Sequence, residues 1–126
     1  MADEKLKIMV LDDEASIGDL LNKFLTKKNY MVTAFTSPKQ ALKHLKNNPV
    51  DLMITDMNMP EMNGLDVTKA AKTSNPDLPI IIMSSSCLQE RKDEMAKLGV
   101  CDYIQKPLNL NYLESRIALN QSVDHR

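Results

Sequence analysis

The sequence predicts an α/β fold in which a doubly wound parallel sheet of five strands is combined with five helices. Short apolar runs alternate with segments of helical periodicity along the 126 residues, and no linker or internal repeat interrupts them. Residues 8–11 and 80–83 are continuously apolar, which is typical of strands buried on both faces of a sheet. Strands that alternate with helices are joined by right-handed crossovers, so we expect a parallel sheet covered by helices on both faces.

The composition is that of one domain and argues against several classes of partner. With 43% hydrophobic residues the chain can build one core, and we expect residues 1–126 to form a single domain. A formal net charge of -1 argues against a nucleic-acid surface or a polybasic membrane anchor. Because the start of the chain has no apolar leader and Cys87 and Cys101 cannot form a disulfide framework, we expect a cytoplasmic protein whose reduced thiols serve packing.

Three strands and two helices are expected in the first half of the chain. The strands cover residues 7–11, 31–35 and 52–56. A helix over residues 15–28 carries an apolar stripe made of Ile17, Leu20, Leu21, Phe24 and Leu25. The second helix starts at Pro38 with Ser37 as its N-cap. Its inward residues are Ala41, Leu42 and Leu45, and it stops near residues 47–49.

A third helix, the fourth strand and a fourth helix follow. Gly64 opens the third helix, which has a weak apolar face and ends at Asn75. The fourth strand, residues 78–83, is the most hydrophobic. The helix expected over residues 89–98 is closed by Gly99, at a position suited to a left-handed C-cap.

The chain closes with a short strand and a last helix. The strand covers residues 101–105, and Asn111 is the expected cap of the helix. The inward residues of this helix are Leu113, Ile117 and Leu119. Residues 120–126 are expected to form a polar tail.

Four of the predicted strands end in polar side chains whose types suit one reaction. Asp12 and Asp13 follow the first strand, Asp56 ends the third, Ser84 follows the fourth and Lys106 follows the fifth. Parallel strands deliver these ends to one rim, where open α/β sheets bind ligands. Four coincident polar ends whose types suit one reaction predict a functional site.

The residue types on this rim predict phosphoryl transfer to Asp56. Three carboxylates in one crevice repel one another unless a cation compensates them, and oxygen ligands favour Mg²⁺, with Mn²⁺ possible, over zinc. Asp56 can then attack phosphorus and form an acyl phosphate. Lys106 supplies a compact positive charge and Ser84 a hydroxyl donor for the phosphoryl oxygens. Neither His44 nor His125 fits a catalytic role.

Each of these residues also has a simpler interpretation. Asp56 could cap the loop that follows it, and Asp12 or Asp13 could be the N-cap of the first helix. Ser84 could begin a turn, and Lys106 could be a surface lysine. Only the combination of all these residues favours the phosphoryl-transfer site.

The motifs at the strand ends resemble those of the receiver domains of two-component response regulators, over essentially the whole chain. The resemblance rests on Asp-Asp after the first strand, D-x-x-M-P-x-x-x-G from Asp56 to Gly64, Ser after the fourth strand and Lys-Pro after the fifth. It implies a flavodoxin-like fold with strand order 2-1-3-4-5. It also implies that a histidine kinase phosphohistidine, or a phosphotransfer protein, donates to Asp56.

The resemblance further implies a ligand set and a switch. Asp13, Asp56 and the main-chain carbonyl of Asn58 would bind Mg²⁺ directly, and Asp12 mostly through water. Lys106-Pro107 would carry a cis peptide bond.

Ser84 looks like the hydroxyl that moves toward the phosphoryl group, and Tyr103 like the aromatic that turns inward with it. The fourth helix, the fifth strand and the last helix would present the altered face to an unknown downstream protein. Without the motif, Tyr103 is a half-buried strand tyrosine.

Two features modify this resemblance. The family more often has Thr where Ser84 stands, which loosens the hydroxyl without removing the donor. Asn58 and Ser86 stand where the family tunes dephosphorylation, and our hypothesis is that Asn58 orients a hydrolytic water.

The leading prediction is a stand-alone receiver, a binding module rather than an enzyme, apart from its own phosphorylation and dephosphorylation. The sequence leaves open a fragment of a longer regulator and either a monomer or a phosphorylation-dependent dimer. A flavodoxin-like cofactor binder is the main alternative, although the Asp12-Asp13-Glu14 loop repels phosphate. A magnesium-dependent phosphatase is a third alternative, but that class needs a second acid two residues after the nucleophile, where this chain has Asn58. A degenerate receiver that signals without phosphate is a fourth, but it fits poorly with the intact acidic cluster.

Overall fold

The computed structural model describes residues 5–122 and contains the predicted alternation of strands and helices. The elements are β1 Lys7–Leu11, α1 Ala15–Lys27, β2 Met31–Phe35, α2 Pro38–Asn47, β3 Leu52–Asp56, α3 Gly64–Ser74, β4 Ile80–Ser84, the 3-10 turn η1 Gln89–Arg91, α4 Lys92–Leu98, β5 Asp102–Gln105 and α5 Leu110–Ser122. None of the helices in this described part is long and apolar enough to cross a membrane.

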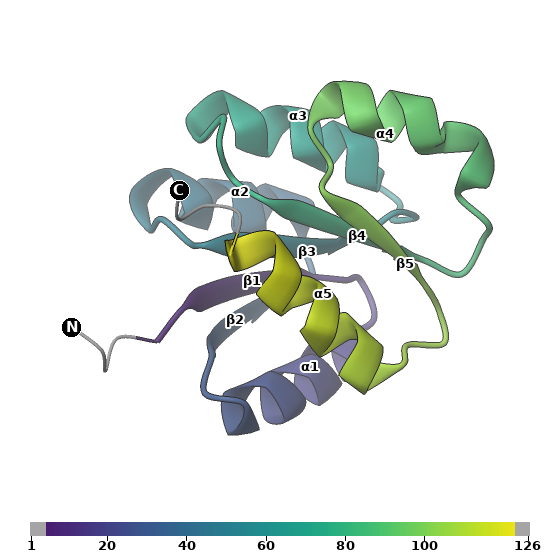
Figure 1. Ribbon diagram of the computed structural model, residues 1–126. Helices are drawn as coiled ribbons and strands as arrows, with labels where there is room; N and C mark the ends of the chain where they lie inside the picture. Colours follow the sequence, from purple (N-terminus) through teal and green to yellow (C-terminus); the bar gives the residue numbers. More distant parts are fainter. Residues whose placement is uncertain (1–4, 123–126) are drawn as a thin grey trace.

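The five strands form one parallel sheet in the order β2-β1-β3-β4-β5, as predicted. Helices cover both faces, with α1 and α5 on one side and α2, α3 and α4 on the other (Figure 1). The three inner strands are almost wholly buried, which explains their continuous apolar sequences. The doubly wound flavodoxin-like fold is therefore confirmed.

The sheet separates two apolar cores because successive strand residues point to opposite faces. One core joins Met9, Met53 and Ile82 to the inner faces of α2, α3 and α4. The other joins Ile8 and Ile54 to α1 and α5. Flexible methionine side chains, among them Met9, Met53 and Met83, fill part of the interior.

Local signals in the sequence set several helix ends. The Ser37 side chain accepts a hydrogen bond from the Gln40 N–H at the start of α2. Asn63 and Asp66 form a reciprocal capping box at the start of α3. Gly99 ends α4 with φ of 89°, a left-handed conformation that favours glycine.

Two predicted core positions and one predicted cap are wrong. Leu20 is 44% exposed because the buried strip of α1 is narrower than its hydrophobic pattern. Leu119 is 50% exposed because it lies two residues, or about 200°, around α5 from the buried Ile117. The α5 cap is Asn109, whose side-chain oxygen accepts from the Tyr112 N–H, so Asn111 lies inside the helix. Cys87 and Cys101 are free and exposed rather than packed.

Smaller differences concern element bounds. β4 begins at Ile80 rather than residue 78, since Pro79 has no N–H for the ladder. The fourth helix divides into η1 and a short α4. Residues 120–122, assigned from the sequence to a polar tail, belong to α5, and the remainder of that tail, with His125, lies outside the described residues. The Lys106-Pro107 bond is cis, as the resemblance implied.

Candidate functional site

Strand register brings the predicted polar residues to one rim of the sheet. Leu11 pairs with Thr55, Asp56 with Met83, and Ser84 with Gln105. The ends of β1, β3, β4 and β5 therefore lie side by side along one edge of the sheet. The Lys106 N–H then donates to the Ser84 carbonyl at 2.7 Å, which holds the ends of β4 and β5 together.

Three carboxylates meet on this rim. Ligand oxygens of Asp12, Asp13 and Asp56 all lie within 4.8 Å of one another. Asp12 and Asp56 are buried, whereas Asp13 is exposed and open to solvent. A set of oxygen donors with one open side fits a hard divalent cation that keeps several of its waters, such as Mg²⁺.

Lys106 lies against these acids rather than in solvent. Its Nζ donates to Asp12 Oδ2 at 2.8 Å, lies 3.3 Å from Asp56 Oδ1 and is 4.0 Å from Glu14 Oε1. Its side chain is only 14% exposed, so the alternative of an ordinary surface lysine is wrong. Sequence reasoning missed the contact with Glu14, although this residue directly follows Asp12-Asp13.

The negative charges of this site are only partly balanced by Lys106. Burial raises the pKa of Asp56, the neighbouring Asp12 raises it further, and Lys106 only partly offsets these effects. Burial lowers the pKa of Lys106, but its hydrogen bond to Asp12 and the charges of Asp12 and Asp56 outweigh burial and leave that pKa above its ordinary value. The cluster therefore holds one lysine charge against several acids and favours a second cation.

Asp12 also has a structural contact. Its Oδ1 accepts from the Glu14 N–H at 2.9 Å, while Glu14 itself is the N-cap residue of α1. Asp12 thus fixes the backbone just before α1 with one oxygen and binds Lys106 with the other. The alternative that Asp12 or Asp13 is the N-cap of this helix is therefore wrong, because Glu14 occupies that position.

The loop after Asp56 is held closely against the sheet. The Met57 N–H donates to the Met83 carbonyl and the Gly64 N–H to the Met57 carbonyl, each at 2.8 Å. A Cβ atom at Gly64 would lie 2.9 Å from the Asp56 carbonyl oxygen and 3.0 Å from Met57 Cα. Glycine is needed here because the start of α3 packs directly on the backbone of Asp56.

Ser84 and Tyr103 lie on the adjacent part of the rim. Ser84 is fully buried, and its Oγ accepts from the Ser86 N–H at 3.0 Å. Tyr103 is half-buried in β5, and its hydroxyl donates to Gln89 Oε1 at 3.2 Å. Asn58 is exposed in the loop that follows Asp56.

Comparison with known proteins identifies the family. The family model for the response regulator receiver domain matches residues 8–118. The transcriptional regulatory protein RprY of Bacteroides fragilis is 32% identical over 115 residues, which cover 91% of this chain and 49% of that protein. The response regulator SaeR of Staphylococcus aureus is 34% identical over 110 residues, which cover 87% of this chain and 48% of that protein.

A solved structure agrees with this result. The response regulator receiver domain protein from Clostridium thermocellum superimposes with a TM-score of 0.86 at 28% identity, over 94% of this chain and 95% of that one. The chain spans about half the length of the two curated relatives. Its acidic group of Asp12, Asp13 and Asp56 fits the phosphorylation site of such domains. The chain belongs to the response regulator receiver domain family of two-component systems.

Proposed function

We propose that Asp56 is the phosphoacceptor of a signalling switch and takes its phosphoryl group from a phosphohistidine of a sensor kinase or phosphotransfer protein. The observation that carries the proposal is the contact of one largely buried lysine, Lys106, with both Asp12 and Asp56. In the reaction, a carboxylate oxygen of Asp56 forms the new P–O bond as the P–N bond breaks, and the imidazole leaves with that electron pair.

The donor set supports a magnesium requirement, with manganese as a possible substitute. Asp12, Asp13, Asp56 and the main-chain carbonyl of Asn58 would hold the ion, Asp12 chiefly through water. When bound, the ion neutralises the acidic cluster and part of the charge on the phosphoryl oxygens.

Lys106 and Ser84 would stabilise the transferred group. The Lys106 ammonium already lies 3.3 Å from Asp56 Oδ1, so it can bind a phosphoryl oxygen with little movement. The Ser84 hydroxyl is available as a donor because its oxygen only accepts, from Ser86, in this state. Turning this hydroxyl toward the phosphoryl group would cost it that contact with the Ser86 N–H.

The switch would then reach the face formed by α4, β5 and α5. Movement of Ser84 leaves space behind it, and Tyr103 can fill that space if its hydroxyl leaves Gln89. The altered face would bind a downstream protein. This part of the proposal rests on Tyr103 being half-buried and on the hydrogen bond from its hydroxyl to Gln89.

The remaining assignments follow from the same proposal. Residues 1–126 would act as one receiver domain that catalyses only its own phosphorylation and dephosphorylation. It would act in the cytoplasm through protein partners, as a monomer or a phosphorylation-dependent dimer, without binding nucleic acid or membrane directly.

The direct test is the intact mass of the chain after incubation with acetyl phosphate, with and without Mg²⁺. We expect a magnesium-dependent gain of one phosphoryl group that is absent from Asp56→Asn. A folded Asp56→Asn chain that still gains the group would place the acceptor elsewhere. No gain by a native chain that binds Mg²⁺, from acetyl phosphate or from a kinase donor, would contradict the proposal.

A further inference from the structure

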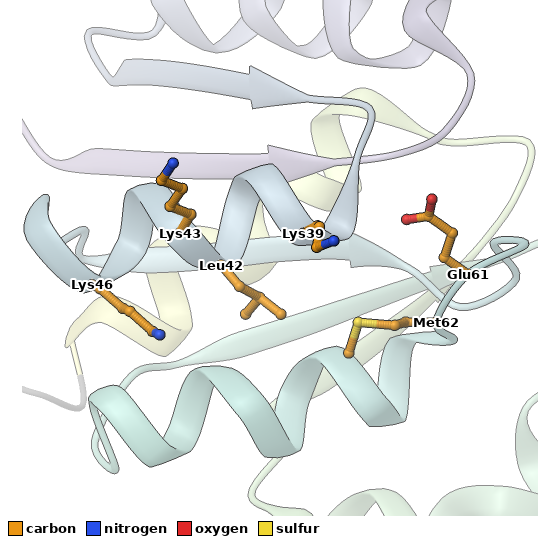
Figure 2. Close-up of a pocket in the computed structure, with 6 residues that line it drawn as sticks. All are labelled: Lys39, Leu42, Lys43, Lys46, Glu61 and Met62. Carbon is orange, nitrogen blue, oxygen red and sulfur yellow. The ribbon is translucent and has the colours of Figure 1, made fainter.

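A groove lies between α2 and the loop that precedes α3. Its lining includes none of the acids of the rim, Asp12, Asp13 and Asp56. Its volume is about 460 Å³, and it is lined by Lys39, Leu42, Lys43, Lys46, Glu61 and Met62. Figure 2 shows Leu42 and Lys46 pointing from α2 toward the space above α3, with Met62 entering the same space from the loop before α3. We propose that this groove binds an acidic, amphipathic segment of a partner protein.

The charge of the groove is the first argument. Lys39, Lys43 and Lys46 occupy positions i, i+4 and i+7 of α2, so they lie along one side of the helix over about 10 Å. All three are exposed, and none takes part in the ion pairs found within residues 5–122. The whole chain is slightly acidic, so this row is a local concentration of positive charge, and Glu61 is the single acid among the six residues that line the groove.

The apolar floor is the second argument. Leu42 and Met62 are half-buried and pack against the core beneath the groove, which leaves part of each side chain accessible from the groove. Methionine adapts to differently shaped apolar partners. The lysine stems extend this floor, because their methylene groups cover apolar surface while their ammonium groups stay in water.

The same features argue for a protein segment over other polyanions. The six lining residues include no aromatic platform on which nucleic-acid bases could stack. Two apolar side chains are too few for an amphipathic face that enters a membrane. Acidic side chains matched to the lysine row, with one or two leucines on Leu42 and Met62, complement both charge and shape.

The test is a titration of the ¹⁵N-labelled, unphosphorylated chain with a synthetic helical peptide that carries a glutamate row beside a leucine stripe. We expect saturable amide shifts confined to α2 and the loop around Met62. Lys43→Gln/Lys46→Gln should raise the dissociation constant about three- to tenfold. The matched pair Lys23→Gln/Lys27→Gln, which removes the same charge from exposed positions on α1, should leave it unchanged.

A second peptide, with serine in place of leucine, should bind more weakly than the first by a similar factor. Equal weakening by both lysine pairs, shifts spread over several helices, or no saturable shift would overturn the proposal. So would equal binding of an oligonucleotide or of anionic phospholipid vesicles of phosphatidylserine and phosphatidylcholine. Because Asp56 is unphosphorylated throughout, the result is independent of the phosphoacceptor proposal.

Discussion

Lys106 joins the ends of three strands, since its Nζ lies 2.8 Å from Asp12 Oδ2 and 3.3 Å from Asp56 Oδ1. The lysine follows β5, and the two acids belong to the ends of β1 and β3. All three side chains are largely buried, so water screens their interaction less than it screens a surface ion pair. This contact makes the site sensitive to any change at Lys106.

Replacing Lys106 should impair phosphoryl transfer more than it impairs metal binding. We expect Lys106→Ala to slow phosphorylation by acetyl phosphate about 100-fold, because a preorganised donor to the phosphoryl oxygens is lost. Lys106→Arg should restore little of the rate, since a planar guanidinium does not replace a compact ammonium in a confined position. Rates are followed by intact mass, with Lys92→Ala, an exposed lysine at the start of α4, as the control. A rate within a factor of about two of native for Lys106→Ala would contradict this role.

Asp56 should make the metal-free protein less stable as pH rises. Its folded-state pKa is raised above the ordinary value of 3.8, first by burial and then by Asp12. A raised carboxyl pKa contributes stability below the ordinary value, and this contribution is lost as pH rises through the folded-state value. Without Mg²⁺, Asp56→Asn should therefore be more stable than the native chain at neutral pH, with a difference that shrinks in acid.

Urea unfolding of both chains across this pH range, in the presence of a chelator, measures the effect. Mg²⁺ should stabilise the native chain more than Asp56→Asn, because the substitution removes one anionic ligand. A native chain that is more stable than Asp56→Asn at neutral pH without metal would contradict this prediction. It would show that Lys106 lowers the pKa of Asp56 by more than burial raises it.

Ser84→Ala should separate phosphorylation from switching. The variant keeps Asp56 and Lys106, so we expect it to be phosphorylated at a reduced rate. The amide shifts of Tyr103 and α5 that accompany phosphorylation should be lost, because no hydroxyl moves toward the phosphoryl group. NMR spectra before and after addition of acetyl phosphate and Mg²⁺ test this, with the exposed Ser85→Ala as the matched control. If phosphorylation shifts these amides in Ser84→Ala as much as in the native chain, Ser84 is not part of the switch.

Gly64→Ala should destabilise the fold even though alanine favours helices. Its Cβ would lie 2.9 Å from the Asp56 carbonyl oxygen, whereas a Cβ at Gly18 would lie 3.2 Å from the Cβ of Ala34. We expect a loss of about 1–3 kcal/mol at Gly64 and a smaller change at Gly18, where the contact is longer and the gain in helix propensity offsets part of its cost. Urea unfolding compares the two variants, and equal effects would show that the backbone contact at Gly64 relaxes.

Asn58→Ala should slow the loss of phosphate from Asp56. Asn58 is exposed two residues beyond the acceptor, a position from which its amide can orient a water for attack on phosphorus. The decay of the phosphorylated mass after removal of the donor measures the rate. We expect a several-fold longer lifetime, with Glu61→Ala in the same loop as a control, and an unchanged lifetime would discard the hypothesis.

Local patterns were sufficient for the elements and for most of the site. Continuous apolar runs predicted the buried strands, and Ser37 and Gly99 marked helix ends through contacts within a few residues. The parallel alternation then placed Asp12, Asp56, Ser84 and Lys106 at one rim, because parallel strands that follow one another through helices all end on the same side. These inferences need only periodicity, capping and chain connectivity, all of which are short-range properties.

Contacts between distant segments needed the tertiary structure. The exposure of Leu20 depends on how α1 lies on the sheet, because this residue fits the apolar pattern of its helix. Leu119, in contrast, lies two residues after Ile117, so helical spacing alone places it on the other side of α5. The choice of Asn109 over Asn111 as the α5 cap depends on the path of the chain after Pro107.

The sequence by itself determined which chemical groups reach the rim, since strand alternation and the polar residues at strand ends are encoded locally. Only the tertiary structure decided that Lys106 contacts Asp12, Asp56 and Glu14 together, and that the lysines of α2 share a groove with Met62. The physical reason is that distances between side chains from different elements depend on strand register and helix packing, which are set by the whole core and not by any one segment.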